Sequence, residues 1–362
     1  MEEKRNMVYD QERIDVMTWL RFPLILGVVV VHCNLFSQVT VWEGSEPDWP
    51  GWLIYIFNNF CYLLLPARVP TLFLISGYFF FRSNKKRDSD FFIYKFGRRV
   101  HSLLIPYIAW NTIAIAILYI RFNVISDCGY SLADYLSGYW DFTQRAGNDP
   151  ADGPLWFIRN LMVVSLTTPV LYLLLKRKVT AIIFISALIL FNFIGSDVQL
   201  TGLSNGAFLF FSTGACLAIH DIDFTRIPHK AGIPLMLMYI PSQLILNTFD
   251  DSSIYAPTAY LLTSAVKIPA TLYIVSLLFR KGVLKPTPEL TKISFLLYAI
   301  HGIIVGMILK SLYVTMDSDN PAVLLGIYIA TPCIIIAISY MLHAFLSRKA
   351  PFMASILLGK RK

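Results

Sequence analysis

The sequence predicts an all-α membrane protein, a polytopic chain that crosses the bilayer about ten times. Hydrophobic residues make up 56% of the 362 residues and charged residues only 15%, whereas a soluble domain carries about 25% charged residues to wet its surface. The mean hydropathy is +0.58. The apolar residues also form long runs, and the longer ones can cross a hydrocarbon layer of ~30 Å as helices that rise ~1.5 Å per residue. These observations exclude a soluble globular domain.

Ten apolar runs are expected to form the helices. They cover residues 16–38, 52–81, 102–121, 154–175, 179–194, 203–219, 232–249, 254–279, 293–312 and 321–346. Pro66 and Pro70 interrupt the second run, so we expect a kinked or broken helix there. The fifth and sixth runs are short. No linker or composition shift divides the chain, so residues 1–362 are expected to form one integral-membrane domain.

The basic residues predict the orientation in the membrane. If the N-terminus is cytoplasmic and the loops alternate, most of the 31 Lys and Arg residues fall in cytoplasmic segments, and the outer loops hold only Arg145. This is the asymmetry of the positive-inside rule. Both termini are therefore predicted to be cytoplasmic, in a multi-pass protein of the cell inner (plasma) membrane. The first run lacks a small-residue cleavage site and contains Arg21 and His32, which argues against a signal peptide.

The net charge of +8 does not point to nucleic acid, because no zinc-finger, RNA-binding or basic-zipper pattern accompanies it. The five cysteines are scattered, with no paired spacing typical of a metal site or a disulfide framework. We therefore expect membrane lipid as a partner, with no nucleic acid, no metal and no permanently bound cofactor.

Arg21 and His32 are the first candidates for chemistry. At 100° per residue the two side chains share one helix face, separated by ~16 Å along the axis if Pro23 does not bend the helix. Charged groups inside a bilayer are costly and usually face a cavity. Alternatively, Arg21 extends to the cytoplasmic surface while a neutral His32 bonds to a neighbouring helix.

Five short motifs follow one another along the chain. They are Ile14-Asp15-Val16 with Arg21 and His32, the apolar run from Val69 that ends in Ser76-Gly77-Tyr78, Arg98-Arg99 followed by Pro106-Tyr107, Leu155-Trp156-Phe157-Ile158-Arg159, and Tyr298-Ala299-Ile300-His301. In this order they resemble the membrane acyltransferase-3 family, whose first helix carries an Arg, ten residues and then a His. One position differs: His101 stands where family members often carry a further basic residue, and it is only partly charged near neutral pH.

The resemblance implies a membrane O-acyltransferase that moves an acyl group, most often acetyl, to a hydroxyl of a cell-envelope carbohydrate or glycolipid. Acyl-CoA, above all acetyl-CoA, would then be a co-substrate. Composition and spacing do not themselves indicate this activity. The alternative is a transporter or flippase for a lipid-linked glycan, which would share the many spans and the intramembrane cations. Span interiors without Asp or Glu disfavour a proton-coupled pump.

For acyl transfer, His32 is the candidate base that takes the hydroxyl proton, or the group that accepts the acyl chain covalently. Arg21 is assigned to the catalytic site with it. Arg21, Arg98 and Arg99 are suited to the phosphates of coenzyme A, although Arg98 and Arg99 could instead only signal topology. The sequence does not distinguish the base from the covalent role of His32, nor phosphate binding from a topology signal at Arg98 and Arg99.

The remaining candidates lie on other spans. Ser76 and Tyr78 are assigned to the donor, although both could serve packing, for which Gly77 would permit close helix approach. Four residues are assigned to the acceptor, namely Arg68, Arg159, Trp156 and His301. Arg68 and Arg159 could orient a sugar or stabilise an oxyanion. For His301 a bonded core histidine is an equal alternative, and for Trp156 an aromatic belt is favoured.

Overall fold

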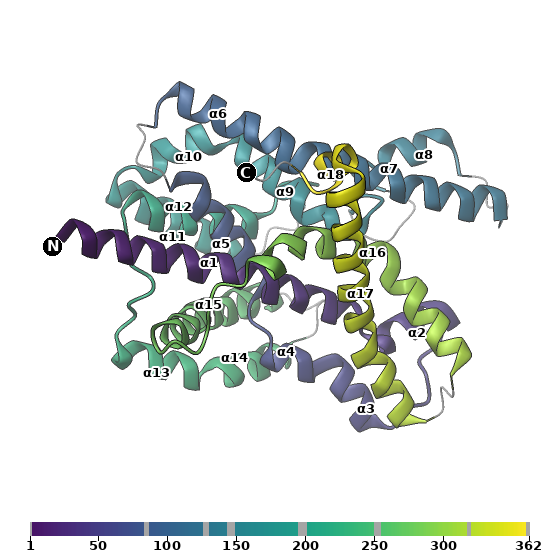
Figure 1. Ribbon diagram of the computed structural model, residues 1–362. Helices are drawn as coiled ribbons and strands as arrows, with labels where there is room; N and C mark the ends of the chain where they lie inside the picture. The colour runs from purple at the N-terminus through teal and green to yellow at the C-terminus, as the bar shows by residue number, and fades with distance from the viewer. Residues whose placement is uncertain are drawn as a thin grey trace.

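The computed structural model describes residues 2–82, 87–125, 130–142, 149–194, 201–249, 255–316 and 320–359. Every regular element within these ranges is a helix, which confirms the all-α prediction. The first of them, α1 (Glu2–His32), runs through the middle of the bundle (Figure 1). The other principal helices are α2 (Leu35–Glu43), α3 (Gly51–Tyr55), α4 (Cys61–Leu64), α5 (Arg68–Phe81), α6 (Ser89–Arg99), α7 (Ile105–Tyr119), α8 (Leu132–Ser137), α9 (Trp156–Leu166), α10 (Thr168–Leu175), α11 (Lys178–Ile194), α12 (Asn205–Ile219), α13 (His229–Leu237), α14 (Tyr239–Leu246), α15 (Ala256–Arg280), α16 (Pro288–Thr315), α17 (Pro321–Lys349) and α18 (Pro351–Leu357).

Six helical segments of the described chain are long and apolar enough to cross a membrane. They are Asp10–His32, Gly51–Phe81, Ser89–Ile125, Ala256–Arg280, Pro288–Thr315 and Pro321–Lys349. A seventh arises if the segments Gly153–Leu166 and Thr168–Leu175, bent by 63°, count as one broken span. Helix length and composition therefore do not confirm the predicted count of about ten. The shortfall lies at α11 and α12, which are short, and at residues 232–249, which divide into α13 and α14.

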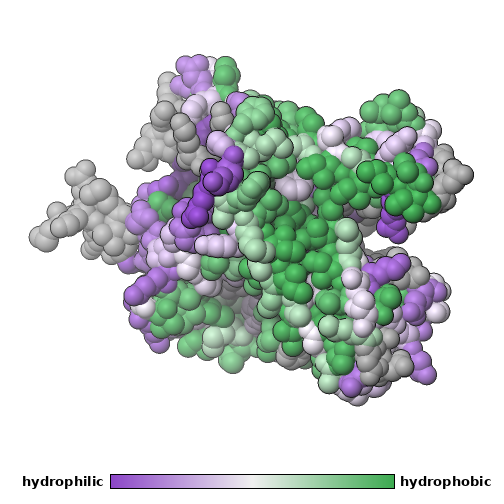
Figure 2. All heavy atoms as spheres, turned by 45° about the vertical axis from the view of Figure 1, so that its right-hand side comes forward, coloured by the Kyte–Doolittle hydropathy of each residue, from purple (hydrophilic) through white to green (hydrophobic). Residues whose placement is uncertain are grey.

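The outer surface of the bundle is apolar, as a lipid-facing surface must be. On α11 the exposed fractions of Val179, Ile182 and Ile183 are 69%, 66% and 63%, a spacing that places all three on one helix face. Figure 2 shows a broad hydrophobic band across the face of the molecule, with hydrophilic side chains gathered beside it. A soluble monomer does not expose so large an apolar area. The chain is a multi-pass membrane protein.

The first predicted run, 16–38, is not one helix. α1 continues through Pro23 without interruption and ends at His32. Residues 33 and 34 then separate it from α2, and the backbone of Asn34 is extended. The buried Asn34 side chain donates a hydrogen bond to Asn58 Oδ1 at 3.1 Å. This polar contact explains why the chain leaves the helix inside an apolar run, and it places His32 at a helix end.

The second run is broken, as the prolines predict. α3, a π-helical segment and α4 end at Leu64, and α5 begins at Arg68 after Pro66. The ammonium group of Lys267 on α15 lies at this break and donates to the carbonyl oxygens of Tyr62 at 2.7 Å and Leu65 at 3.0 Å. It also donates to Gln243 Oε1 at 2.8 Å. A cation at the carbonyl end of a helix is favourable, and unpaired carbonyls are costly in a membrane.

We expect Lys267→Met to destabilise the protein, because the methionine fills the same space but supplies no donor to the broken span. Each buried acceptor left unpaired costs about 1–3 kcal/mol. The measurement is the melting temperature of the purified protein in detergent, with accumulation in the membrane as a second readout. Lys310→Met is the matched control, because Lys310 is exposed on α16. Equal melting temperatures for the two variants would contradict the role of Lys267 at the break.

α5 and α12 pack with their backbones in contact. A Cβ atom on Gly77 would lie 2.0 Å from the carbonyl oxygen of Phe211, and one on Gly214 would lie 1.9 Å from that of Leu74. Neither position accepts a larger residue without separating the helices. The expected role of Gly77 in close helix approach is confirmed, and the contact fixes the position of α5.

Candidate active site

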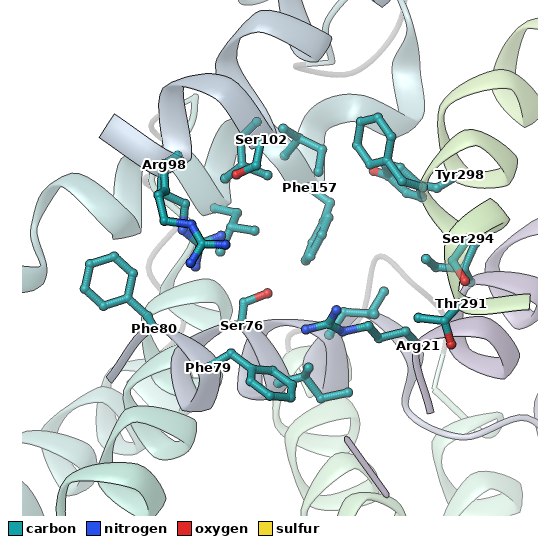
Figure 3. A pocket seen from close by; sticks show the side chains of 18 of the residues that line it. Arg21, Ser76, Phe79, Phe80, Arg98, Ser102, Phe157, Thr291, Ser294 and Tyr298 are labelled. Atoms are coloured by element: carbon teal, nitrogen blue, oxygen red, sulfur yellow. The ribbon is translucent and has the colours of Figure 1, made fainter. Parts of the chain in front are cut away.

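A cavity of about 440 Å³ lies between six helical elements, and Figure 3 shows it from close by. Its wall consists of Arg21 and Ile25 from α1, Leu72, Ile75, Ser76, Phe79 and Phe80 from α5, Lys95, Arg98, Arg99, Ser102 and Leu103 from α6 and the π-helical turn after it, Phe157, Ile158 and Leu161 from α9, and Thr291, Ser294, Phe295 and Tyr298 from α16. On α5 and α16 these residues recur every three or four positions, so each helix presents one continuous face to the cavity.

One wall of the cavity is strongly basic. Lys95, Arg98 and Arg99 lie on one face of α6, because residues three and four positions apart are neighbours on a helix. Asp88 begins this helix by accepting a hydrogen bond from the backbone N–H of Phe91 at 3.2 Å. The guanidinium group of Arg21 enters from the opposite side, 4.6 Å from the centre of the Phe79 ring. In Figure 3 the Arg21 side chain extends into the cavity toward Ser76.

No Asp or Glu stands among the lining residues that the structure describes. The charges of Arg21 and Arg98 act on Arg99, and those of Arg98 and Arg99 act on Lys95, so the cluster repels itself. Such a group of cations in a low-dielectric wall favours an anion between them. The remaining lining is mostly aromatic and aliphatic, with serine and threonine hydroxyls at Ser76, Ser102, Thr291 and Ser294. The cavity is therefore suited to a ligand with an anionic part and an apolar part.

The faces that line the cavity continue beyond it along three helices. On α1, His32 follows Arg21 and Ile25; on α16, His301 follows Tyr298 by three positions; and on α5, Arg68 precedes Leu72 by four. The uninterrupted α1 confirms that Pro23 does not break the helix that carries Arg21 and His32. The helix faces that line the basic cavity therefore also carry His32, His301 and Arg68.

His32 and His301 face each other beyond the cavity lining. Their ring centroids are 5.2 Å apart. His32 is exposed at the end of α1, whereas His301 is fully buried. Arg68 lies close enough to His32 for their charges to interact, and its aliphatic chain lies against Gly27, where a Cβ atom would be 2.9 Å from Arg68 Cδ. The predicted site residues His32 and His301 therefore meet at one place, within the electrostatic influence of Arg68.

Three other predicted site residues lie outside the cavity lining. Tyr78 is buried and packs edge-on against Phe79 and Phe224. Trp156 packs partly buried against the core, while the next residue, Phe157, lines the cavity. Arg159 is 3% exposed; it donates to the Trp140 carbonyl oxygen and lies 5.6 Å from the Trp140 ring centre. In the structure Arg159 joins α9 to the segment after α8.

Sequence reasoning missed several residues of the site. Lys95 was counted only as a topology signal, although its spacing to Arg98 and Arg99 places it on their helix face. Thr291 and Ser294 were not singled out, and no signal beyond their helical spacing to Tyr298 could have identified them. Asp152, which precedes α9, was not singled out either; it is only 2% exposed, and its Oδ1 lies against Gly302, the residue after His301.

Comparisons with known proteins show which family the chain resembles. A family model described as an acyltransferase domain matches residues 14–340. The chain is 26% identical over 367 residues to the succinoglycan biosynthesis protein ExoH of Rhizobium meliloti, an alignment that covers 96% of this chain and 92% of that protein. No solved structure matches it. The family model spans nearly the whole chain, and the protein belongs to the acyltransferase-3 family as a membrane acyltransferase.

Proposed function

We propose that the protein is an O-acyltransferase that moves an acyl group, most often acetyl, from acyl-CoA to a hydroxyl of a cell-envelope carbohydrate or glycolipid. The observation that carries the proposal is the acid-free basic cavity, which shares a face of α1 with His32.

The cavity suits an acyl-CoA donor. Coenzyme A carries phosphates, and the planar guanidinium groups of Arg21, Arg98 and Arg99 bind phosphate through paired charge-assisted hydrogen bonds. Lys95 adds a fourth cation to the same wall. The rise of α1 from Arg21 to His32 is ~16 Å, so an extended donor whose phosphates lie at Arg21 would bring its thioester toward His32. The apolar lining from α9 and α16 would accompany the arm of the donor.

His32 supplies the base in this proposal. Its neutral ring takes the proton as the acceptor hydroxyl attacks the thioester carbonyl, the C–S bond breaks, and the proton passes to the departing thiolate. The products are the ester and free coenzyme A. A covalent acyl-histidine is the alternative route with the same overall balance. Arg68, close to His32, would stabilise the negative charge that develops on the carbonyl oxygen.

The proposed saccharide acceptor and the proposed inner-membrane location are supported by other observations. The relative from Rhizobium meliloti is named for succinoglycan biosynthesis, which supports a saccharide acceptor. The basic residues favour cytoplasmic termini and hence an inner-membrane protein. A cytoplasmic donor would then enter beside the basic wall of the cavity.

The test compares envelope glycans from cells with and without the gene by mass spectrometry, beside the transfer of label from [¹⁴C]acetyl-CoA into glycans of disrupted envelopes. We expect an acyl modification that disappears with the gene and label transfer that requires the protein. Disrupted envelopes abolish transport, so transfer in them separates an acyltransferase from a flippase. Glycans that change location but never acyl content would contradict the proposal.

A further inference from the structure

The buried His301 has a defined proton arrangement. Its Nδ1 lies 2.5 Å from the carbonyl oxygen of Tyr298, one helical turn earlier. A carbonyl oxygen can only accept, so Nδ1 carries the proton and donates it to Tyr298. The neutral ring then has a bare Nε2, which can only accept a hydrogen bond. His301 is therefore a fixed acceptor as long as this bond is kept.

The Nε2 atom of His301 is buried and has no hydrogen-bond partner. The ring as a whole is 0% exposed. A buried polar atom without a partner is rare in a native fold, and it marks a place where another group completes the arrangement. Three residues from Tyr298, which lines the cavity, an unused acceptor points to a donor that arrives during the reaction cycle.

The His32 ring lies beside His301 and has an N–H to give. The two ring centroids are 5.2 Å apart with an angle of 49° between the planes. Since a ring nitrogen lies about 1.1 Å from its ring centre, the facing nitrogens can approach to about 3 Å, which is a hydrogen-bond distance. His32 is exposed at the end of α1, so its ring has room to turn toward His301, whereas His301 is held by Tyr298.

We propose that His301 is a positioning residue that sets the tautomer and direction of His32. The inference rests on the proposed function of His32 as the base. One His32 nitrogen donates its N–H to Nε2 of His301, which leaves the other nitrogen bare and directed at the acceptor hydroxyl. When His32 takes the hydroxyl proton, the bond to His301 stabilises the imidazolium, and the proton then passes to the departing thiolate.

The arrangement gives His301 the orienting role that a carboxylate has in a Ser-His-Asp triad, but without a negative charge. The proposed chain of hydrogen bonds runs from the Tyr298 carbonyl through His301 to His32. It also connects the two regions of the site, because Tyr298 lines the basic cavity while His301 faces His32. A donor seated in the cavity would thus contact the residue whose carbonyl fixes the tautomer of His301.

The test uses two replacements of His301 with different chemistry. His301→Leu removes the acceptor, whereas His301→Gln offers an amide oxygen near the place of Nε2. With [¹⁴C]acetyl-CoA and disrupted envelopes as donor and acceptor probes, we expect His301→Leu to lower the maximal rate at least about tenfold, since a wrongly oriented base is a poor one. The KM for acetyl-CoA should change little, and His301→Gln should retain more activity than His301→Leu. His343→Gln, on α17, is the matched control.

A spectroscopic readout separates positioning from packing. In ¹⁵N-histidine-labelled protein, the nitrogen shifts of His301 should show a protonated Nδ1 and a bare Nε2, and His32 should show one dominant tautomer. In His301→Leu we expect His32 to lose that single tautomer. The measurement on the unaltered protein tests the tautomer of His301 even if the variants fail to fold. A protonated Nε2 on His301 would overturn the assignment.

Two further results would overturn the inference without touching the proposed function. One is full activity of His301→Leu while His32→Ala is inactive. The other is a raised KM of His301→Leu for the envelope acceptor with an unchanged maximal rate, which would indicate that His301 contacts the substrate instead. Unchanged transfer by His32→Ala, in contrast, would remove the proposed function of His32 itself.

Discussion

Replacement of His32 by alanine is expected to abolish acyl transfer while the protein accumulates in the membrane as before. The ring is exposed at the end of α1, so its removal opens no core cavity. A positioned base contributes about 10²–10⁴-fold to the rate, and its loss would reduce acylation below detection in cells. The measurement is the acyl content of envelope glycans by mass spectrometry, normalised to the amount of protein in the membrane.

His343→Ala is the appropriate control for His32→Ala. It removes a histidine from α17 that does not line the cavity, and we expect normal acylation. Acylation that is unchanged in His32→Ala would exclude this residue from the mechanism, whichever of the base and covalent routes is considered.

Replacement of Arg21 by alanine is expected to weaken use of the donor more than use of the acceptor. The guanidinium extends into the cavity that Arg98 and Arg99 also line, where the phosphates of acyl-CoA are proposed to bind. A hydrogen bond to a charged group contributes about 1.5–3 kcal/mol, so the KM for acetyl-CoA should rise by about tenfold or more. Initial rates at varied acetyl-CoA in isolated envelopes measure the effect.

Lys176→Ala serves as the control for the loss of one positive charge, because Lys176 is exposed between α10 and α11. It should leave the KM for acetyl-CoA unchanged. Equal donor affinity in Arg21→Ala and the parent would refute the assignment of Arg21 to the donor. Arg98→Ala and Arg99→Ala should act in the same direction as Arg21→Ala if the basic wall binds one anion.

The sequence was sufficient to predict the fold class, because the chain has too few charged residues to cover the surface of a soluble domain. Pro66 likewise predicted where the second span is broken. It could not establish the number of spans. Hydropathy treats the 203–219 and 232–249 runs as separate crossings, whereas the structure has one short helix in the first and a division between α13 and α14 in the second. Nor could it place the end of α1, which depends on a contact between Asn34 and Asn58 in another segment.

The site was predictable where a single helix decides the geometry. Arg21 and His32 share a face of α1, and Arg98 and Arg99 lie together on α6, so spacing was enough for both pairs. It was harder to predict which of two adjacent residues faces the cavity, since a step of one residue turns a side chain by ~100° around the helix. The structure places Phe157 rather than Trp156 in the cavity lining.

Contacts between distant segments were not accessible to such reasoning. The approach of His301 to His32 requires α16 to pack on α1, and the role of Lys267 at the break requires α15 to lie beside α4. Neither pairing leaves a periodic signal in the sequence.

The close packing of α5 on α12 at Gly77 and Gly214 has a consequence for the shape of the cavity. Because α5 and α12 already touch through Phe211 and Leu74, the wall that carries Ser76 cannot retreat to admit a bulkier ligand. Room for such a ligand would have to come from smaller side chains on other walls, such as at Phe157 on α9 or Phe295 on α16. The glycine pair thereby makes one side of the cavity rigid and leaves its width to the residues on the other sides.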